Sequence, residues 1–340
     1  MGKGRNMKYD RNLKRPLKVL TWHIHGSYLF YLTQTPVEFY LPVKDGKHEG
    51  YGGSSGVLPW GSNVHDIPAD KVKDLEFDCI LFQSKKNYLE DQYEILSEKQ
   101  RALPKIYLEH DPPREVPTDT KHVVDDPNIL LVHVTHFNRL MWDNNNAPSK
   151  VIEHGVLIQE EVKYTGEMEK GIVVINGIVK RGRRLGLDIF EKVRKEVPLD
   201  IIGMGSEEVG GLGEIPNPEV CAFTSRYRFF FNPIRYTSLG LSVCEAMMAG
   251  MPIVGLATTE MPVTIKNNVS GYIHTDVDYL IEHMKMLIQH PEKAKILGEG
   301  ARTTAMQKFN IDRFKNEWFE TFSYVVGQKS LKKIQLEVGR

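Results

Sequence analysis

Short apolar runs recur along the first half of the chain and are separated by polar or glycine-containing stretches. They cover residues 17–22, 39–43, 77–82, 105–108 and 129–134. Continuous apolar runs of this length are typical of strands that are covered on both faces of a parallel sheet. Residues 88–103 instead place apolar side chains at helical spacing, which predicts an amphipathic helix. The pattern therefore predicts an α/β arrangement of alternating strands and helices.

The second half of the chain repeats this alternation. Further strands are predicted at residues 171–175, 199–202, 220–223, 229–232 and 252–256. A helical pattern covers residues 185–196, and another dominates from residue 292 to residue 326. A chain of 340 residues is long for one core, so we expect two doubly wound domains of about 150 residues each.

Composition narrows the class of protein. Lys and Arg together number 44, as do Asp and Glu, so the overall charge indicates no nucleic-acid partner. The cysteines, Cys79, Cys221 and Cys244, lie in apolar contexts without metal-binding spacing, which is typical of free thiols in a reducing compartment. No apolar run reaches 18 residues, and the basic start lacks the apolar core of a signal peptide. We therefore expect a cytoplasmic protein.

Both ends of the chain are basic. Residues 1–18 carry seven Lys or Arg side chains against Asp10, and Lys329, Lys332 and Lys333 lie near the other end. One interpretation is a solubilising tail. The other is peripheral contact with the anionic inner face of a membrane, since each basic residue near such a surface contributes roughly 1 kcal/mol.

Residues 236–255 form the most informative segment, because they combine a tight loop, a short helix and a buried strand. Gly240 lets the backbone approach a ligand without a Cβ in the way. The helix that follows points its free N–H groups and its positive dipole end at this loop, which suits a diphosphate. Glu245 lies a little further into the helix, where its carboxylate can accept two adjacent hydroxyls such as a ribose diol. The segment therefore predicts a nucleotide-diphosphate site.

A structural interpretation of Glu245 is also open. Ser242 and Glu245 fit the capping-box pattern S-x-x-E, in which the carboxylate only satisfies the backbone. This interpretation starts the helix near Val243 and leaves about two turns before Gly250, which is short for a helix. We therefore favour the ligand-binding interpretation.

The same segment resembles the donor-site motif of the retaining glycosyltransferases of family 4, which have the GT-B fold. Their motif reads E-P-F-G-L-x-x-x-E-A-M-A-x-G-x-P-V-V, with seven residues between its two glutamates. Thr237 stands in the place of the first glutamate. The resemblance extends over about residues 172–319 and more loosely over the first half. The matching residues are Gly240, Leu241, Glu245, Ala246, Met247, Ala249, Gly250 and Pro252.

This resemblance implies two Rossmann-like domains with a cleft between them and a C-terminal helix that crosses back to the first domain. The expected parts are an acceptor-binding domain (1–152), a donor-binding domain (153–305), the returning helix (306–327) and a basic tail (328–340). Residues 151–156 resemble the V-I-P-N-G-V hinge of the family. The implied donor-binding residues are Thr237, Ser238, Leu239, Gly240, Leu241 and Glu245.

The basic turn at residues 180–184 is a second candidate site. It follows the predicted strand 171–175, and open α/β sheets bind their ligands at the carboxyl ends of strands. Arginine recognises phosphate in a bidentate manner, and a leaving diphosphate gains negative charge. We select Arg181 and Arg184 as catalytic residues of this kind. An exposed turn without a ligand is the alternative.

Histidines supply the remaining candidates. His110 lies in a segment that resembles the H-D or H-E-P segment of the family, whose histidine faces the donor sugar, so it is the third expected catalytic residue. A structural surface histidine is the alternative. His25 and His23 are expected on one face of the first strand's end, because residues i and i+2 align there. We expect His25, Gly26 and Gly53 to line the acceptor site, with Gly53 in a mobile loop at residues 50–56.

Metal binding by this pair of histidines is the weaker interpretation, because no carboxylate stands at a fixed spacing from them. We therefore expect no metal site. The sequence as a whole predicts a glycosyltransferase that moves a sugar from a UDP- or GDP-sugar to the hydroxyl of a glycan, lipid-linked sugar or small glycoside. No cofactor is expected, and the resemblance implies retention of configuration without a metal.

Two other functions stay open. A sugar-nucleotide epimerase of the same fold would use acidic residues for proton transfer and would need no acceptor. A catalytically silent protein that binds nucleotide-sugars is suggested by Thr237, because the first motif glutamate is missing.

Overall fold

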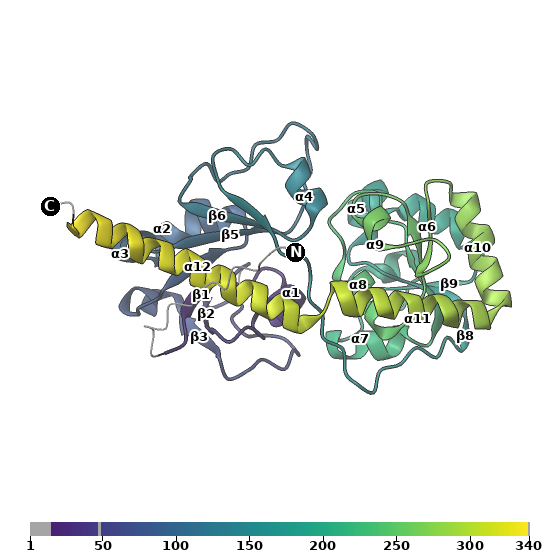
Figure 1. The fold of residues 1–340 in the computed structure, drawn as a ribbon. Coiled ribbons are helices and arrows are strands. Elements are labelled where there is room, and N and C mark those ends of the chain that lie inside the picture. Colours follow the sequence, from purple (N-terminus) through teal and green to yellow (C-terminus); the bar gives the residue numbers. More distant parts are fainter. Residues whose placement is uncertain (1–14, 47–48, 339–340) are drawn as a thin grey trace, which may run out of the picture.

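The computed structural model describes residues 15–46 and 49–338. Two parallel sheets form two halves of the molecule, which lie side by side in Figure 1. Successive residues of the strands belong to different apolar clusters: Val19 packs on one face of the first sheet and Leu20 on the other. Ile172 and Val173 divide in the same way in the second sheet. Both sheets are therefore covered on both faces, as the continuous apolar runs predict.

The first sheet has the order β3-β2-β1-β4-β5-β6-β7, and its neighbouring strands are parallel. Its strands are β1 Lys18–Thr21, β2 Glu38–Val43, β3 Val64–Pro68, β4 Cys79–Phe82, β5 Lys105–Glu109, β6 Ile129–His133 and β7 Ser149–Val151. The strands that the sequence predicts are β1, β2, β4, β5 and β6. The edge strands β3 and β7 lack an apolar run because they are less covered, so the pattern misses them.

Helical segments of the first half are α1 Gly26–Leu32, η1 Ala69–Asp74, the π-helical turn η2 Asn87–Asp91, α2 Gln92–Ile95, α3 Glu98–Arg101 and α4 His136–Met141. The prediction of one helix over 88–103 is wrong. The chain is extended at Leu96, with φ −102° and ψ 141°. Ser97 then starts a new helix with a capping box, in which its side chain accepts the amide of Gln100 and the Gln100 side chain accepts the amide of Ser97. This local capping competes successfully with helix continuation.

The second sheet has the order β12-β11-β10-β8-β9 and is also parallel. Its strands are β8 Met168–Val174, β9 Leu199–Ile202, β10 Tyr227–Asn232, β11 Ile253–Leu256 and β12 Gly271–His274. The helical segments are α5 Ile178–Arg181, η3 Gly182–Leu185, α6 Leu187–Val193, η4 Ser206–Val209, α7 Asn217–Thr224, α8 Leu241–Ala249, α9 Met261–Thr264, α10 Val277–Gln289 and α11 Pro291–Lys308.

One strand prediction in this half is wrong, because residues 220–223 belong to helix α7. Pro218 lies in the first turn of this helix, where its fixed φ favours a helical start. Ala222 is exposed, whereas Val220, Cys221 and Phe223 are half-buried against the core, so this run has one exposed position as in a surface helix and does not belong to the sheet. A run of four apolar residues cannot by itself separate a strand from a short helix.

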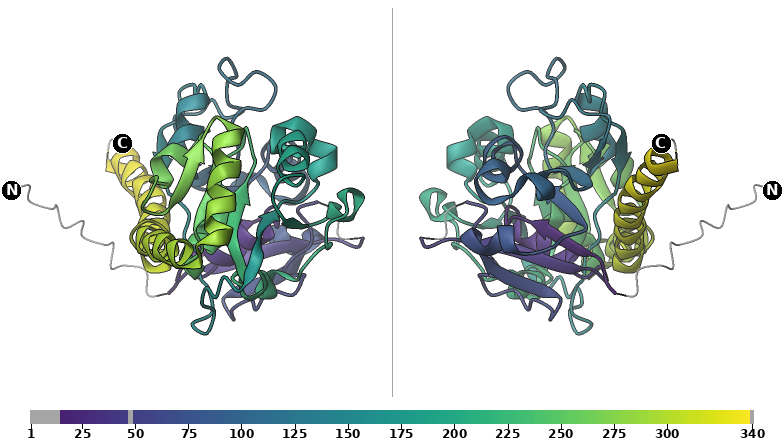
Figure 2. Two further views of the ribbon diagram at one scale, coloured as in Figure 1. Left: turned by 90° about the vertical axis from the view of Figure 1, so that its right-hand side faces the viewer. Right: turned by 90° about the vertical axis from the view of Figure 1, so that its left-hand side faces the viewer.

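Helix α12, Ile311–Val338, leaves the second half and runs along one side of the first (Figures 1 and 2). The indole Nε1 of Trp318 donates to the hydroxyl of Tyr28 at 3.2 Å, and Lys150 Nζ donates to Thr321 Oγ1 at 3.0 Å. At the switch between halves, a Cβ on Gly155 would lie 2.3 Å from Phe314, so the glycine lets α12 pack closely. Residues 328–338 continue this helix where a tail was expected.

The basic N-terminal segment lies mostly outside the described residues. Within the described part, Arg15 pairs with Asp78 at 2.7 Å, and Lys18 lies over the ring of Tyr40. Membrane contact through residues 1–14 therefore stays a prediction. None of the described helices is both long enough and apolar enough to cross a membrane. The three cysteines are free thiols, and Cys79 and Cys244 are buried.

Candidate functional site

The loops at the carboxyl ends of the two sheets meet at the junction between the halves. Hydrogen bonds of 2.7 to 2.9 Å cross this junction between residues far apart in sequence. They join Tyr31 Oη to Glu245 Oε1, Tyr236 Oη to Pro113 O, the Phe137 amide to Glu260 Oε2, Asn217 Nδ2 to Ser27 Oγ, and His154 Nε2 to Leu239 O. Because ligands of open α/β sheets bind at this edge, the junction is where a site is expected.

Helix α8 begins at the junction with its N-terminus open. Gly240 is the N-cap residue, with φ −69° and ψ 138°, and it provides no side-chain cap. A Cβ on Gly240 would meet only the hydroxyl of Ser242, at 3.5 Å, so there is room in front of the helix. The capping-box alternative is wrong, because the helix starts at Leu241 and Ser242 lies inside it. Gly250 ends the helix in the left-handed region, with φ +90°.

Glu245 lies deep in the junction, with only 7% of the residue exposed. Its Oε1 accepts the hydroxyl of Tyr31 at 2.7 Å. Burial raises the pKa of Glu245, while the hydrogen bond from Tyr31 acts in the opposite direction. Tyr31 belongs to α1, which the sequence pattern did not predict. The hydrogen bond from Tyr31 involves Oε1, so Oε2 is the candidate acceptor for a ligand hydroxyl.

The loop before α8, residues 236–240, is called the donor loop, and it is held in place by the segment that connects the two halves. The carbonyl of Leu239 accepts a 2.8 Å hydrogen bond from His154 Nε2. Ser238 is buried, and in the described structure its hydroxyl has no partner. Thr237 is half-buried. An unpartnered buried hydroxyl costs about 1–3 kcal/mol, which a ligand at this loop would recover.

The basic turn divides into two parts with different surroundings. Arg183 Nη1 pairs with Asp188 Oδ2 at 2.5 Å, and Arg235 holds the same carboxylate at 2.6 and 2.8 Å. Arg183 is therefore occupied by a structural ion pair. This leaves Arg181 and Arg184 as the arginines of the turn that are predicted to bind a ligand.

Arg184 is joined directly to the donor loop. Its carbonyl accepts the amide of Arg235 at 3.0 Å and that of Tyr236 at 3.3 Å. Burial lowers the pKa of the Arg184 guanidinium, and the positive charges of Arg114 and Arg181 lower it further. Tyr236 also donates its hydroxyl to the carbonyl of Pro113 at 2.9 Å, so the structure brings the basic turn close to Arg114, a residue of the first half that was not predicted from the sequence. Its only signal was its place just after the His110 segment.

His110 has a fixed hydrogen-bonding partner that decides its tautomer. Its Nε2 lies 3.1 Å from Oε1 of Gln83. The amide nitrogen of Gln83 donates to Thr21 Oγ1 at 2.9 Å and to the carbonyl of Trp22 at 2.8 Å, so Oε1 must accept. The proton of a neutral His110 therefore lies on Nε2, and Nδ1 keeps its lone pair.

The surroundings keep this imidazole uncharged. Burial lowers the pKa of His110 well below its usual value, and the neighbouring His25 and His154 act in the same direction. The rings of His25 and His110 are 4.2 Å apart. Burial also lowers the pKa of His25, and it lowers that of His154 to about 4. At neutral pH, His110 is thus a hydrogen-bonding group and not a cation.

The prediction that His23 and His25 lie on one face of the first strand's end is wrong. Strand β1 ends at Thr21, so His23 and His25 do not share a strand face. His25 is the N-cap residue of α1 and lies beside His110, whereas Nδ1 of His23 lies against the carbonyl of Gly53. A Cβ on Gly26 would lie 3.0 Å from Nε2 of His23. Of these residues, His25 is the one that the structure brings to His110.

Gly53 has a structural explanation as well. Its φ is +56°, and a Cβ there would lie 2.4 Å from Val43 and 2.7 Å from Asp66. The next residue, Ser54, donates its amide to Asp66 Oδ1 at 2.7 Å. Bridges also tie Gly50 and Gly52 to the end of β1 and to β2. Residues 50–54 of the loop are therefore held against the sheet, and mobility of the loop stays a prediction.

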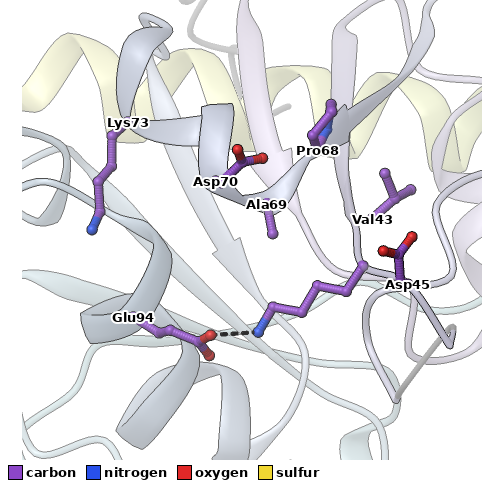
Figure 3. Close-up of a pocket in the computed structure, with 8 residues that line it drawn as sticks. Val43, Asp45, Pro68, Ala69, Asp70, Lys73 and Glu94 are labelled. Atoms are coloured by element: carbon purple, nitrogen blue, oxygen red, sulfur yellow. Dashed lines mark hydrogen bonds and ion pairs between the residues drawn. The ribbon is translucent and has the colours of Figure 1, made fainter.

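A separate hollow of about 660 Å³ lies at the carboxyl ends of β2 and β3 (Figure 3). Lys44 crosses it to pair with Glu94 at 2.6 Å, and Asp45, Asp70 and Lys73 add charges of both signs. None of the predicted site residues lines it, so it is not the site at the junction. In the described part of the chain, no three His, Cys, Asp or Glu side chains gather in a metal-binding arrangement.

The part of the chain that contains the donor loop matches a known protein family. Residues 203–304 match the family described as Glycosyl transferases group 1. The chain is also 27% identical over 88 residues to trehalose synthase of Pyrococcus horikoshii. This match covers 26% of the chain and spans 21% of the length of that protein.

Solved structures resemble the whole chain. Sucrose-phosphate synthase from Thermosynechococcus elongatus has a TM-score of 0.63 at 12% identity, covering 96% of this chain and 100% of its own. Anabaena HepE in complex with UDP has a TM-score of 0.65 at 12% identity, and the match covers 91% of this chain and 100% of the HepE chain. The predicted architecture is thereby confirmed: the chain has the GT-B fold, and its residues 203–304, which carry the donor loop and α8, match the group 1 glycosyl transferases.

Proposed function

We propose that the protein is a glycosyltransferase that moves a sugar from a nucleotide-diphosphate sugar to an acceptor hydroxyl. The observation that supports this most strongly is the open N-terminus of α8 at Gly240, inside the region that matches the glycosyl transferases. Arg181 and Arg184 lie in the turn that is bonded to the loop before this helix. Cations and helix amides together form a suitable site for a diphosphate.

In the proposed reaction, the bond between the anomeric carbon and the diphosphate oxygen breaks, and the acceptor oxygen bonds to the same carbon. Arg181, Arg184, the loop amides near Gly240 and the α8 dipole stabilise the charge that develops on the leaving group. We propose that they do so without a metal ion. Attack from the face that the diphosphate leaves retains configuration, and a phosphate oxygen takes the proton of the acceptor hydroxyl.

The proposed role of His110 follows from its tautomer. With the proton on Nε2 held by Gln83, the Nδ1 lone pair can accept a hydrogen bond from a hydroxyl of the donor sugar. Because the imidazole is neutral, it adds no charge that would compete with the arginines for the diphosphate. His110 thus orients the sugar from the first half while the second half holds the nucleotide.

The proposed nucleotide contacts involve Glu245 and the donor loop. Glu245 Oε2 accepts a ribose hydroxyl, while Ser238 and the amides of Leu239 and Gly240 hold the sugar in place of the missing glutamate at Thr237. Anabaena HepE, one of the similar structures, was solved with UDP and with UDP and glucose, which makes UDP-sugars the first donors to test.

Incubation with labelled UDP- and GDP-sugars and a panel of glycan, lipid-linked and small glycoside acceptors tests the function. Release of nucleotide together with transfer of label is the expected result. An isomerised donor would indicate an epimerase, and a bound but unchanged donor would indicate a silent binding protein. Repeating the reaction in EDTA tests the proposed independence of metal, which loss of activity would contradict.

We further propose a cytoplasmic location, with the alternative that the basic N-terminal segment contacts an anionic membrane. Co-sedimentation of the full chain and of a variant without residues 1–14 with phosphatidylserine vesicles decides between a free tail and a membrane contact.

A further inference from the structure

Arg114 lies at the junction although it belongs to the first half. It follows His110 by four positions, and Pro113 before it restricts the chain. The guanidinium donates from Nη2 to Asp111 Oδ2. Just over half of its side chain is exposed, so Arg114 is not part of the core.

Tyr236 connects Arg114 to the basic turn of the second half. Its hydroxyl donates to the carbonyl of Pro113 at 2.9 Å, and its amide donates to the carbonyl of Arg184 at 3.3 Å. The ring also packs edge-on against Phe137 of the first half. Tyr236 therefore bonds both to the residue before Arg114 and to Arg184. These two hydrogen bonds hold the two arginine-bearing segments close together.

The charges at this place are unbalanced. Arg114 is bonded to Asp111, while Arg114 and Arg181 act on Arg184 as like charges and Asp111 acts on it in the opposite direction. Asp111 takes one nitrogen of Arg114, which leaves most of the five N–H donors of that guanidinium for another partner. A polyanion bound between the two halves would offset the repulsion and bind these donors.

We propose that Arg114 forms, together with Arg181 and Arg184, one anion site that spans the junction, and that its ligand is the diphosphate group of the donor. This inference rests on the proposed function, since it assigns to that diphosphate a third cation from the opposite half. A consequence is that the diphosphate, and not the nucleoside, links the two halves when the donor binds.

Calorimetric titration of Arg114→Ala with UDP, GDP and the free nucleosides tests the proposal. The better-binding diphosphate should lose affinity about tenfold, the low end for a charged hydrogen bond, because Arg114 is partly exposed. Affinity for the nucleoside should not change. Arg183→Ala is the matched control, because Arg183 is paired with Asp188 and should leave both affinities as they are.

Tyr236→Phe adds a test of the link between the segments. If Tyr236 positions Arg114, the double variant Tyr236→Phe/Arg114→Ala should bind the diphosphate hardly more weakly than Arg114→Ala alone. Additive losses would show that Tyr236 does not act through Arg114 and would overturn this part of the proposal.

Other outcomes separate the inference from the function on which it rests. If Arg184→Ala weakens diphosphate binding and Arg114→Ala does not, Arg114 is only a partner of Asp111, and the inference fails while the proposed function stands. If the unaltered protein binds neither UDP nor GDP, both fail. Circular dichroism of each variant establishes that a loss of affinity is not a loss of fold.

Discussion

Replacing Gly240 by alanine tests whether this glycine is required for ligand binding or for the fold. The backbone at Gly240 has φ −69° and ψ 138°, a conformation that any residue adopts. The added Cβ would meet only Ser242 Oγ, at 3.5 Å, which is ordinary contact. The described structure therefore contains no steric reason for a glycine at this position.

The expected effect on stability is small. Gly→Ala at a compatible position stabilises by about 0.4–1 kcal/mol through the unfolded chain. Alanine is a poorer N-cap residue than glycine, which costs a similar amount, on the order of 0.5–1 kcal/mol. The free energy of unfolding of Gly240→Ala should therefore stay within about 0.5 kcal/mol of the parent protein.

The expected effect on ligand binding is large. Because Gly240 is the N-cap residue, the new methyl group lies beside the first N–H groups of α8, where the proposed diphosphate binds. Loss of one hydrogen bond to a charged group costs about 1.5–3 kcal/mol, which corresponds to a roughly 10- to 100-fold rise in Kd. Affinity for the free nucleoside should change little, since it has no phosphate at this place.

Urea denaturation measures the stability, and calorimetric titration with UDP, GDP and their nucleosides measures the affinities. Gly327→Ala is the matched control: the glycine lies in α12, and a Cβ there has no neighbour within 4 Å. This variant should gain about 0.5–1 kcal/mol of stability without any change in affinity. Unchanged diphosphate affinity in Gly240→Ala would show that the α8 N-terminus is not the phosphate site.

Four further predictions concern other residues of the site. Glu245→Ala should weaken nucleotide binding roughly 10- to 100-fold in a titration, because a charged hydrogen bond is lost; unchanged binding, or unfolding of the variant, would indicate a structural role. His110→Ala should strongly reduce turnover in a transfer assay and leave nucleotide affinity nearly intact; the reverse pattern would contradict the division of roles between the halves. Because Thr237 offers one uncharged hydroxyl, the best sugar donor should bind at most about tenfold tighter than its nucleoside diphosphate, a difference of ~1.4 kcal/mol, and a larger ratio of Kd values would show that this account of Thr237 is wrong. Burial lowers the pKa of His154 to about 4 in the folded protein, so protonation of this side chain favours the unfolded chain. The stability that neutral His154 contributes is complete above about pH 6.5 and is lost as the pH falls towards about 4. Urea denaturation across this range should show a weaker pH dependence in His154→Gln, and an identical dependence would exclude His154 as a source.

The hydrophobic pattern alone determines most of the two sheets. Strands such as β1 and β10 are covered on both faces, and burial on both faces requires a continuous apolar run that is visible in the sequence. The ends of α8 are also determined by local sequence, because Gly240 is its N-cap residue and Gly250 ends it in the left-handed region. The same segment carries the match to the glycosyl transferases.

The hydrophobic pattern does not predict elements with weak local signals, and it assigns the wrong type to elements with ambiguous ones. The edge strand β3 is partly exposed, so no apolar run marks it. The run at 220–223 is as compatible with a short helix as with a strand, and Pro218 in the first turn favours the helix. In the same way, Ser97 divided a segment whose spacing predicted a single helix.

Only the tertiary structure decided which residues meet at the junction. Tyr31 and Glu245 are separated by 214 positions, yet their side chains are hydrogen-bonded at 2.7 Å. Arg114 and Arg184, like His25 and His110, are also far apart in sequence but near each other in the fold. Periodicity and propensity report how a segment folds on itself, whereas these contacts depend on how two independently patterned sheets, tied together by α12, pack with their carboxyl ends face to face.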